Sequence, residues 1–107
     1  MNSITITMVK IYLTEDEGRI DTLVKRLHDW EKIRGVTVYR AISGFGKSGA
    51  LHSSRFADMS LNLPVVVEFF DEPQKIELVL EHLSGFIDSE HIVFWNANLV
   101  VGSKGTA

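Results

Sequence analysis

The sequence contains no cysteine, which removes several kinds of chemistry at once. Without a thiol the chain forms no disulfide bond, has no thiolate nucleophile and offers no thiolate ligand to a metal. No apolar run approaches the roughly 18 residues that a membrane-spanning helix needs. The segment from Met1 to Val9 lacks a basic start followed by an apolar core, so we expect no secretory signal and a cytoplasmic location.

Positive charge is also scarce. The chain has 11 Lys and Arg residues against 14 Asp and Glu residues, a formal net charge of −3. Proteins that bind nucleic acid in general need a basic surface, because binding is driven by the release of counterions from the phosphates. We therefore expect no nucleic-acid partner, although a local basic patch is compatible with this balance.

The length of 107 residues is typical of one domain, and 45% of the residues are hydrophobic, as in ordinary globular proteins. We therefore expect a single domain over residues 1–107. The chain is too short for a full dinucleotide-binding fold of two halves or for a TIM barrel.

Four stretches rich in β-branched and aromatic residues predict strands at 4–14, 36–42, 65–70 and 92–101. Two intervening stretches predict helices, because their apolar residues recur at helical spacing. These stripes are Ile20, Leu23, Val24, Leu27, Trp30 and Ile33 in the first helix, and Ile76, Val79, Leu80 and Leu83 in the second. The order predicts an α+β ferredoxin-like βαββαβ fold, with a four-stranded antiparallel sheet and two helices on one face.

Capping signals predict where each helix begins and ends. Thr14 with Glu17 predicts a capping box for the first helix, and Gly35 predicts its end. In the second helix Asp71 and Gln74 are expected to form the capping box, with Pro73 in the first turn.

The sheet face that the helices leave open is expected to be apolar. Its predicted members are Met8, Tyr12, Val38 or Tyr39, Phe69 or Phe70, and one of Phe94 and Trp95. A face of this kind usually meets another subunit, so we expect an oligomer. The alternative is that some of these residues point at the helices and the outer face is more polar.

The segment 43–63 is far longer than a hairpin loop, and loops of this length are usually functional or disordered. A short helical turn around residues 54–60 is compatible with its pattern. It begins with Gly44-Phe45-Gly46-Lys47-Ser48-Gly49, whose glycines let backbone N–H groups converge on an anion while Lys47 adds charge. The spacing imitates a dinucleotide fingerprint, but no helix follows directly. It also imitates a P-loop, but that motif needs a glycine where Ala41 stands. Phosphate contact and a hinge without a ligand both remain open.

Basic and hydroxyl side chains cluster around this segment. Arg40, Lys47, His52, Ser53, Ser54 and Arg55 together predict a phosphate-contacting lining. Arg40 has an alternative, because it lies in a predicted strand and could pair with Glu68 across the sheet.

Signs of catalysis are weak. His52 and Ser53 are neighbours without the Gly-x-Ser-x-Gly elbow of a serine hydrolase, so we expect no catalytic residue and no enzyme. A small enzyme using His52 as a base is the alternative. The stretch 88–91 carries two carboxylates and a histidine, but it lacks the paired histidines of a helical zinc site, so we expect a solvated turn and no metal.

Several runs of the sequence resemble an uncharacterised bacterial and archaeal family of PII-like proteins. They are Arg34-Gly35-Val36-Thr37-Val38-Tyr39-Arg40, Gly44-Phe45-Gly46 with His52, and Leu63-Pro64-Val65-Val66-Val67-Glu68 followed by Asp71-Glu72. The resemblance covers residues 8–101. It implies a ferredoxin-like subunit that forms a homotrimer, with the open sheet faces toward the threefold axis.

The resemblance also implies a function for the long loop. In the PII superfamily the corresponding T-loop contacts a partner, such as a membrane transporter or an enzyme, and helps to bind an adenine nucleotide between subunits. By position, Gly44, Phe45, Gly46, Lys47 and Gly49 form the loop base beside an AMP, ADP, ATP or cyclic nucleotide ligand, with Thr37 and Arg40 on the neighbouring strand. The stretch 85–91, which should hold phosphates, has no Lys or Arg and two carboxylates, which repel a triphosphate unless a cation bridges them. An interaction trimer without a ligand is therefore the second hypothesis.

Overall fold

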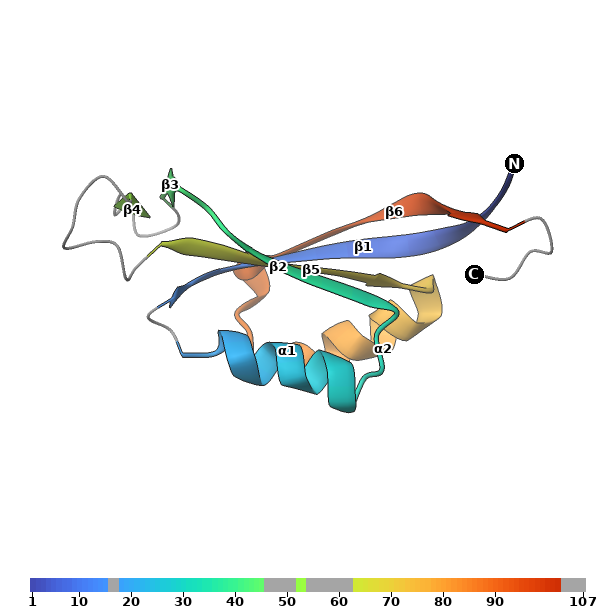
Figure 1. The fold of residues 1–107 in the computed structure, drawn as a ribbon. Helices are drawn as coiled ribbons and strands as arrows, with labels where there is room; N and C mark the ends of the chain where they lie inside the picture. Colours follow the sequence, from blue (N-terminus) through green and yellow to red (C-terminus); the bar gives the residue numbers. More distant parts are fainter. Residues whose placement is uncertain (16–17, 46–51, 54–62, 103–107) are drawn as a thin grey trace.

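The computed structural model describes residues 1–15, 18–45, 52–53 and 63–102. The elements of this part of the chain are β1 (Asn2–Thr14), α1 (Ile20–Asp29), β2 (Gly35–Arg40), β3 (Ser43–Gly44), β4 (His52–Ser53), β5 (Pro64–Asp71), α2 (Pro73–Leu83), the short 3-10 helix η3 (Ser89–His91) and β6 (Ile92–Val101). Four strands form an antiparallel sheet in the order β2-β5-β1-β6, and both helices lie against one face of it (Figure 1). The predicted ferredoxin-like fold is confirmed. Neither described helix is long and apolar enough to cross a membrane.

The side chains of the central strand β1 alternate between the two faces of the sheet. Val9, Ile11 and Leu13 are buried beneath the helices. Lys10 and Tyr12 point to the opposite face, as successive side chains of a strand do. The buried residues that α1 and α2 contribute to the same core are Leu23, Leu27, Ile76, Val79 and Leu83.

Strand register settles which aromatic residues lie on the outer face. Met8 pairs with Phe70 on one side and with Trp95 on the other, so all three share that face. Tyr39 joins them, because it pairs with Val66, which in turn pairs with Tyr12. The alternatives Val38, Phe69 and Phe94 belong to the helix side by the same register. The predicted apolar outer face is therefore present in this structure.

The predicted start and end of α1 are wrong. Thr14 is the last residue of β1, where it pairs with Pro64, so it is held in the sheet and cannot begin the helix. The helix starts at Ile20 with Arg19 at the N-cap and no side-chain capping bond; Glu17 lies outside the described residues. It ends at Asp29, which leaves the Trp30 side chain 82% exposed instead of in the apolar stripe.

Gly35 opens β2 instead of ending α1. A Cβ atom at this position would lie 2.7 Å from Cε1 of Phe70, so glycine allows the backbone to cross close to that ring. The cap of α2 also differs from the prediction. Glu72 is the N-cap residue and no side chain caps the helix, while Asp71 is the last residue of β5. Pro73 lies in the first turn, as predicted.

The connection between α1 and β2 is tied to the rest of the fold by polar contacts. Asp71 accepts hydrogen bonds from the backbone N–H groups of Arg34, at 2.9 Å, and of Glu72, at 2.8 Å. The Nζ atom of Lys75 lies 3.2 Å from the same carboxylate and 2.6 Å from the carbonyl oxygen of Lys32, to which it donates. These contacts anchor the end of the sheet where β2 begins.

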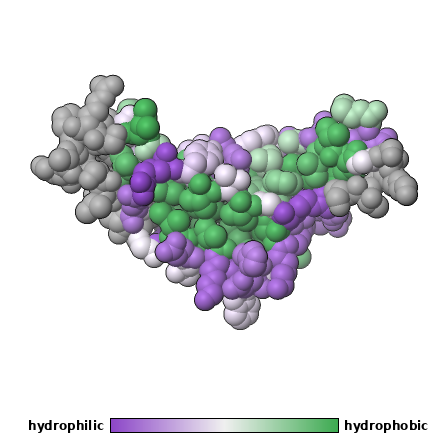
Figure 2. Space-filling model, viewed as in Figure 1, coloured by the Kyte–Doolittle hydropathy of each residue, from purple (hydrophilic) through white to green (hydrophobic). Residues whose placement is uncertain are grey.

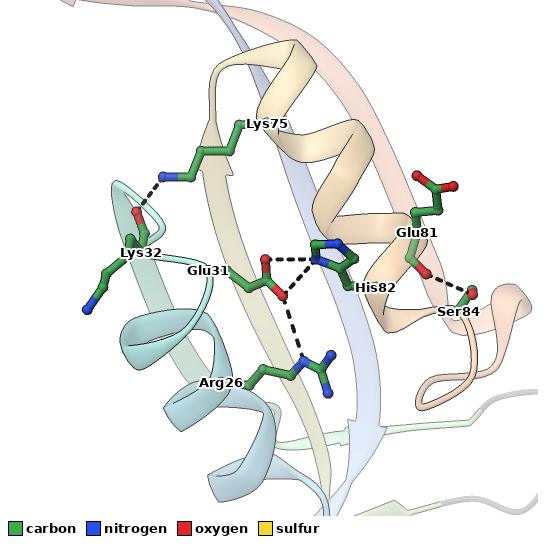
Figure 3. Close-up of polar contacts among 7 residues, drawn as sticks. All are labelled: Arg26, Glu31, Lys32, Lys75, Glu81, His82 and Ser84. Carbon is green, nitrogen blue, oxygen red and sulfur yellow. Dashed lines mark hydrogen bonds and ion pairs between the residues drawn. The ribbon is translucent and has the colours of Figure 1, made fainter.

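A second contact joins the C-terminal halves of the two helices. Figure 3 shows the Glu31 carboxylate between the His82 ring and the Arg26 guanidinium. Nδ1 of His82 lies 3.1 Å from both carboxylate oxygens of Glu31, and Nε of Arg26 lies 3.7 Å from one of them. His82 therefore has a structural partner.

Candidate functional site

The residues predicted to bind a ligand fall into three groups. Thr37 and Arg40 lie on β2, Gly44 is the last residue of β3, and Phe45 follows it. His52 lies on β4, where only the backbone is described. The remaining four are outside the described residues: Gly46, Lys47, Gly49 and Arg55. The turn considered for residues 54–60 also lies outside them.

Strands β3 and β4 form a two-residue antiparallel ladder within the long segment. The sequence pattern did not predict this ladder. Ser43 pairs with Ser53, and Gly44 pairs with His52. The backbones of two predicted site residues, Gly44 and His52, are therefore brought side by side. In Figure 1 this small hairpin stands at the end of the sheet opposite to the N-terminus.

The base of the segment is held against Pro64. The N–H group of Ala41 donates to the Pro64 carbonyl oxygen at 2.8 Å, so the chain still runs beside β5 after β2 ends. A Cβ atom on Gly44 would meet Cγ of Pro64 at 3.2 Å. On the other side of β5, the N–H group of Glu15 donates to the Leu63 carbonyl oxygen at 3.2 Å. The start and the end of the long segment are therefore fixed at one place.

A cleft of about 460 Å³ opens beside this base, between the start of α1 and the end of β2. Its lining residues are Glu15, Gly18, Ile20, Asp21, Val38, Tyr39, Arg40 and Val65. Arg40 forms an ion pair with Glu15 across it. The lining thus combines one guanidinium and two carboxylates with aliphatic and aromatic surface.

The alternative pairing of Arg40 with Glu68 is wrong. Register places Thr37, and not Arg40, opposite Glu68. Arg40 lies three residues after Thr37 on the same strand, so its side chain points to the opposite face of the sheet. The predicted residues of β2 are thereby separated: Arg40 lines the cleft on the helix side, and Thr37 lies on the outer face.

Lys10 is the centre of a polar group on the outer face. Its Nζ atom lies 3.7 Å from Oε1 of Glu68 and 5.8 Å from the centre of the Trp95 ring. A hydrogen bond with the Tyr39 hydroxyl is the main cause that raises the pKa of Lys10 above its ordinary value, with smaller contributions from Tyr12 and Glu68. A lysine in this setting is a stable cation, which gives the apolar face a fixed charge at its middle.

Reasoning from sequence missed two members of the cleft. Glu15 was expected in the first turn of a helix capped by Thr14, and Asp21 was assigned no function, so neither was expected to meet a ligand. The available signal was the strand register: once Thr14 is placed opposite Pro64 and Arg40 opposite Val65, Glu15 must lie near Arg40.

The stretch 88–91, considered for a metal, forms η3 and the residues around it. Within the described residues no three His, Asp or Glu side chains are grouped to hold a metal ion.

Comparison of the fold with solved structures identifies its class. CPII from Thiomonas intermedia K12, "a nitrogen regulatory PII-like protein" bound to ADP, AMP and bicarbonate, superposes with a TM-score of 0.67 at 14% identity over 92% of this chain and 91% of that one. A putative PII-like signaling protein from Thermus thermophilus, TTHA0516, gives a TM-score of 0.62 at 17% identity, with coverage of 92% and 91%. The fold is thus that of the PII-like proteins.

Sequence comparison then gives the family. The chain belongs to the DUF190 family, "Uncharacterized ACR, COG1993", which it matches over residues 6–99. A UPF0166 protein of Aquifex aeolicus is 37% identical over 82 residues, which are 73% of this chain and 78% of the relative. The UPF0166 protein MJ1524 of Methanocaldococcus jannaschii is 32% identical over 90 residues, with coverage of 80% and 82%. The resemblance to a PII-like family is confirmed.

Proposed function

We propose that this chain is a cytoplasmic, PII-like regulatory subunit without enzymatic activity, which binds an adenine nucleotide and contacts a partner protein through residues 43–63. The observation that carries the proposal is the position of Arg40. Its side chain lines the cleft, and its backbone lies three residues before β3, where the long segment begins. A ligand that moves this side chain acts directly on the base of the segment.

Arg40 is the group that meets phosphate. Its side chain is 64% exposed and already bound to the carboxylate of Glu15, so a phosphate can replace that carboxylate without new burial of the charge. A guanidinium binds phosphate through two parallel hydrogen bonds, which fixes the orientation of the ligand. Lys47 and Arg55 are predicted to add charge from the long segment.

The rest of the cleft suits a base and a sugar. The freed carboxylate of Glu15, together with Asp21, can accept hydrogen bonds from ribose hydroxyls, as acidic residues do in other nucleotide sites. Val38 and Val65 supply apolar surface for an adenine ring. With two carboxylates near one guanidinium, each added phosphate charge costs binding energy. We expect AMP and ADP to bind more tightly than ATP.

Binding would act as an order–disorder switch on the long segment. When a phosphate binds the Arg40 guanidinium, Glu15 loses its ion-pair partner and the segment gains a ligand at its base. The ordered segment would then present a different surface to a partner, such as a membrane transporter or an enzyme. We place the subunit in a homotrimer, and the exposed aromatic outer face around Lys10 supports this assembly.

A thermal-shift panel tests the nucleotide. AMP, ADP, ATP and cyclic nucleotides are each added at millimolar concentration, with and without bicarbonate, because CPII was solved with ADP, AMP and bicarbonate. A ligand at about 100 times its Kd should stabilise the native state by about 2.7 kcal/mol. Arg40→Ala and Lys47→Ala should reduce the rise in Tm.

Arg34→Ala is the matched control, because Arg34 is also a basic residue beside β2 but contacts Glu72 at the opposite end of the strand. It should keep the full shift. If no nucleotide in the panel raises the Tm of the wild-type chain, the nucleotide proposal is refuted.

A ligand-free interaction trimer is the second candidate, and the outer face supports it as well. It predicts a trimer by light scattering and no change in Tm with any nucleotide of the panel. It also predicts that deletion of residues 46–58 abolishes binding of a partner. The panel therefore separates the two candidates.

A further inference from the structure

The ion pair between Glu15 and Arg40 joins a fixed carboxylate to an exposed guanidinium. The side chain of Glu15 is 18% exposed, whereas that of Arg40 is 64% exposed. The backbone of Glu15 is held in place as well, because its N–H group donates to the Leu63 carbonyl oxygen at 3.2 Å and the preceding residue, Thr14, pairs with Pro64. The carboxylate is therefore anchored at the mouth of the cleft, and a ligand reaches Arg40 only beside it.

Glu15 occupies the position on Arg40 that a phosphate needs. A guanidinium binds carboxylates and phosphates with the same planar set of N–H donors. The contact with Glu15 uses Nε of Arg40, which is one of these donors. Two anions cannot both use that donor, so a phosphate that binds Arg40 through it must first displace the carboxylate.

The covalent chain makes Glu15 an effective competitor. A group that is tethered next to its binding partner acts at an effective concentration in the millimolar range, without any loss of freedom on association. A simple anion in solution must exceed this concentration before it replaces the carboxylate. The ion pair itself is weak, as pairs at the protein surface are, so a ligand with further contacts in the cleft can still displace it.

The rest of the cleft supplies such contacts. Its apolar lining residues are Ile20, Val38 and Val65. Figure 2 shows hydrophobic surface on the helix side of the sheet, beside hydrophilic surface at the end where β2 leads into the long segment. A ligand that carries a phosphate and an apolar ring gains from both kinds of surface, whereas inorganic phosphate gains from the guanidinium alone.

The second acidic residue of the cleft differs from Glu15. Asp21 also lines the cleft, but no ion pair joins it to Arg40 in the part of the chain that the structure describes. Asp21 therefore adds negative charge without taking a donor of the guanidinium. The two carboxylates allow competition for Arg40 to be separated from general repulsion of anions.

We propose that Glu15 is an internal competitor that keeps inorganic phosphate and other simple anions off Arg40 and sets the selectivity of the cleft for nucleotides. This inference rests on the nucleotide site of the proposed function and names the residue that makes it selective. Inorganic phosphate bears the whole cost of displacing Glu15. A nucleotide recovers part of that cost, because the displaced carboxylate can accept a hydrogen bond from the ribose.

Titrations of the full chain with inorganic phosphate and with AMP, each followed by the rise in Tm, test the inference. Glu15→Gln removes the charge and keeps an acceptor oxygen for the ribose. It should bind inorganic phosphate about fivefold more tightly than the wild type does, which corresponds to the loss of one surface ion pair. Its affinity for AMP should rise only about twofold, because a neutral amide is a weaker acceptor for the ribose hydroxyls than a carboxylate is.

Two further variants control for charge. Asp21→Asn removes the same charge from the cleft but no competitor, so it should strengthen phosphate binding by less than about twofold, as expected for a screened repulsion. Glu72→Gln removes a carboxylate that lies 4.0 Å from Arg34 at the opposite end of β2, and it should leave both affinities unchanged. Circular dichroism checks that each variant is folded.

A double variant makes the test specific to Arg40. Competition requires the guanidinium, so Glu15→Gln should give no gain in phosphate binding when it is combined with Arg40→Ala. Two residues that act through one contact give such a non-additive result.

Three results would overturn the inference. In the first, Glu15→Gln binds phosphate no more tightly than the wild type. In the second, Asp21→Asn gains as much as Glu15→Gln, so that general charge is the cause. In the third, the gain from Glu15→Gln persists without Arg40. A failure of the nucleotide proposal looks different: AMP then stabilises no variant, while inorganic phosphate still separates Glu15→Gln from Asp21→Asn and supports the competitor role.

Discussion

The two ends of β2 are held by different kinds of contact. At its start, Asp71 is nearly buried and receives two backbone N–H groups and the Lys75 ammonium. At its end, Arg40 is largely exposed and meets one carboxylate, Glu15, at the mouth of a cleft. The first arrangement can be lost only with cost to the fold, while the second can be exchanged for a ligand. The proposed switch needs both, because a segment that moves on ligand binding must move against something fixed.

The largest expected effect is at the fixed end. Asp71→Ala removes the acceptor of the Arg34 and Glu72 N–H groups, and it should lower the free energy of unfolding by about 2–3 kcal/mol. Glu15→Ala at the other end removes an ion pair at the protein surface, which should cost no more than about 1 kcal/mol. Urea unfolding of both variants measures the difference. Equal losses would show that the two ends are held equally.

Glycine substitutions should sharpen the same contrast with a smaller effect. Gly35→Ala sets a methyl group against the Phe70 ring at 2.7 Å and should destabilise the fold by about 1–3 kcal/mol. Gly44→Ala meets Cγ of Pro64 at 3.2 Å and should cost less than about 1 kcal/mol, since a contact at this distance needs a shift of only a few tenths of an ångström.

Gly85→Ala is the control for both, because nothing lies within 4 Å of the added carbon. Unfolding curves should rank the three variants in this order of loss. A Gly44 variant that loses more than the Gly35 variant would contradict the ranking.

The smallest expected effect concerns pH. Burial by itself would raise the pKa of Asp71, but the N–H groups of Glu72 and Arg34 and the Lys75 ammonium outweigh it, and the pKa is lowered. A carboxyl whose pKa is lower in the folded state gives stability that is present above its unfolded pKa, near 3.9, and is lost as the pH falls through the folded value. The stability difference between wild type and Asp71→Asn should therefore shrink below about pH 4. A difference that stays constant from pH 7 to 3 would exclude this origin.

The elements that could be predicted from sequence are those governed by a regular pattern. Alternation placed Val9 and Ile11 on one face of β1 and Lys10 and Tyr12 on the other, and the structure confirms this. The predicted bounds of β6, 92–101, agree with the structure. Local hydrophobic patterning decides such features, and tertiary pairing does not oppose it.

The errors occurred where tertiary pairing competes with a local signal. Thr14 has the side chain of a helix cap, but its pairing with Pro64 keeps it in the sheet. Asp71 also has the side chain of a cap, but its oxygens serve the Arg34 and Glu72 N–H groups at the end of β5. A side chain of the capping type can bond to any N–H group nearby, so its presence alone does not locate a helix end.

The cleft was only partly predictable, for a similar reason. Arg40 was identified from the chemistry of its side chain, but its partner depends on a register that no local pattern encodes. Glu15 follows the end of β1 and is remote from Arg40 in sequence, so only the positions of Leu63 and Pro64 between them bring the two together. The roles of Lys47, Gly49 and Arg55 remain predictions.

The contrast between the two tryptophans has an optical consequence. Trp30 is almost fully exposed, whereas Trp95 lies on the outer face with the Lys10 ammonium 5.8 Å from its ring. Its emission should therefore depend on whether that face meets water or another subunit, while the emission of Trp30 should stay that of a solvated indole. A chain with Trp30→Phe then has a single native tryptophan at the predicted meeting place of the subunits, so its spectrum records assembly without any attached dye.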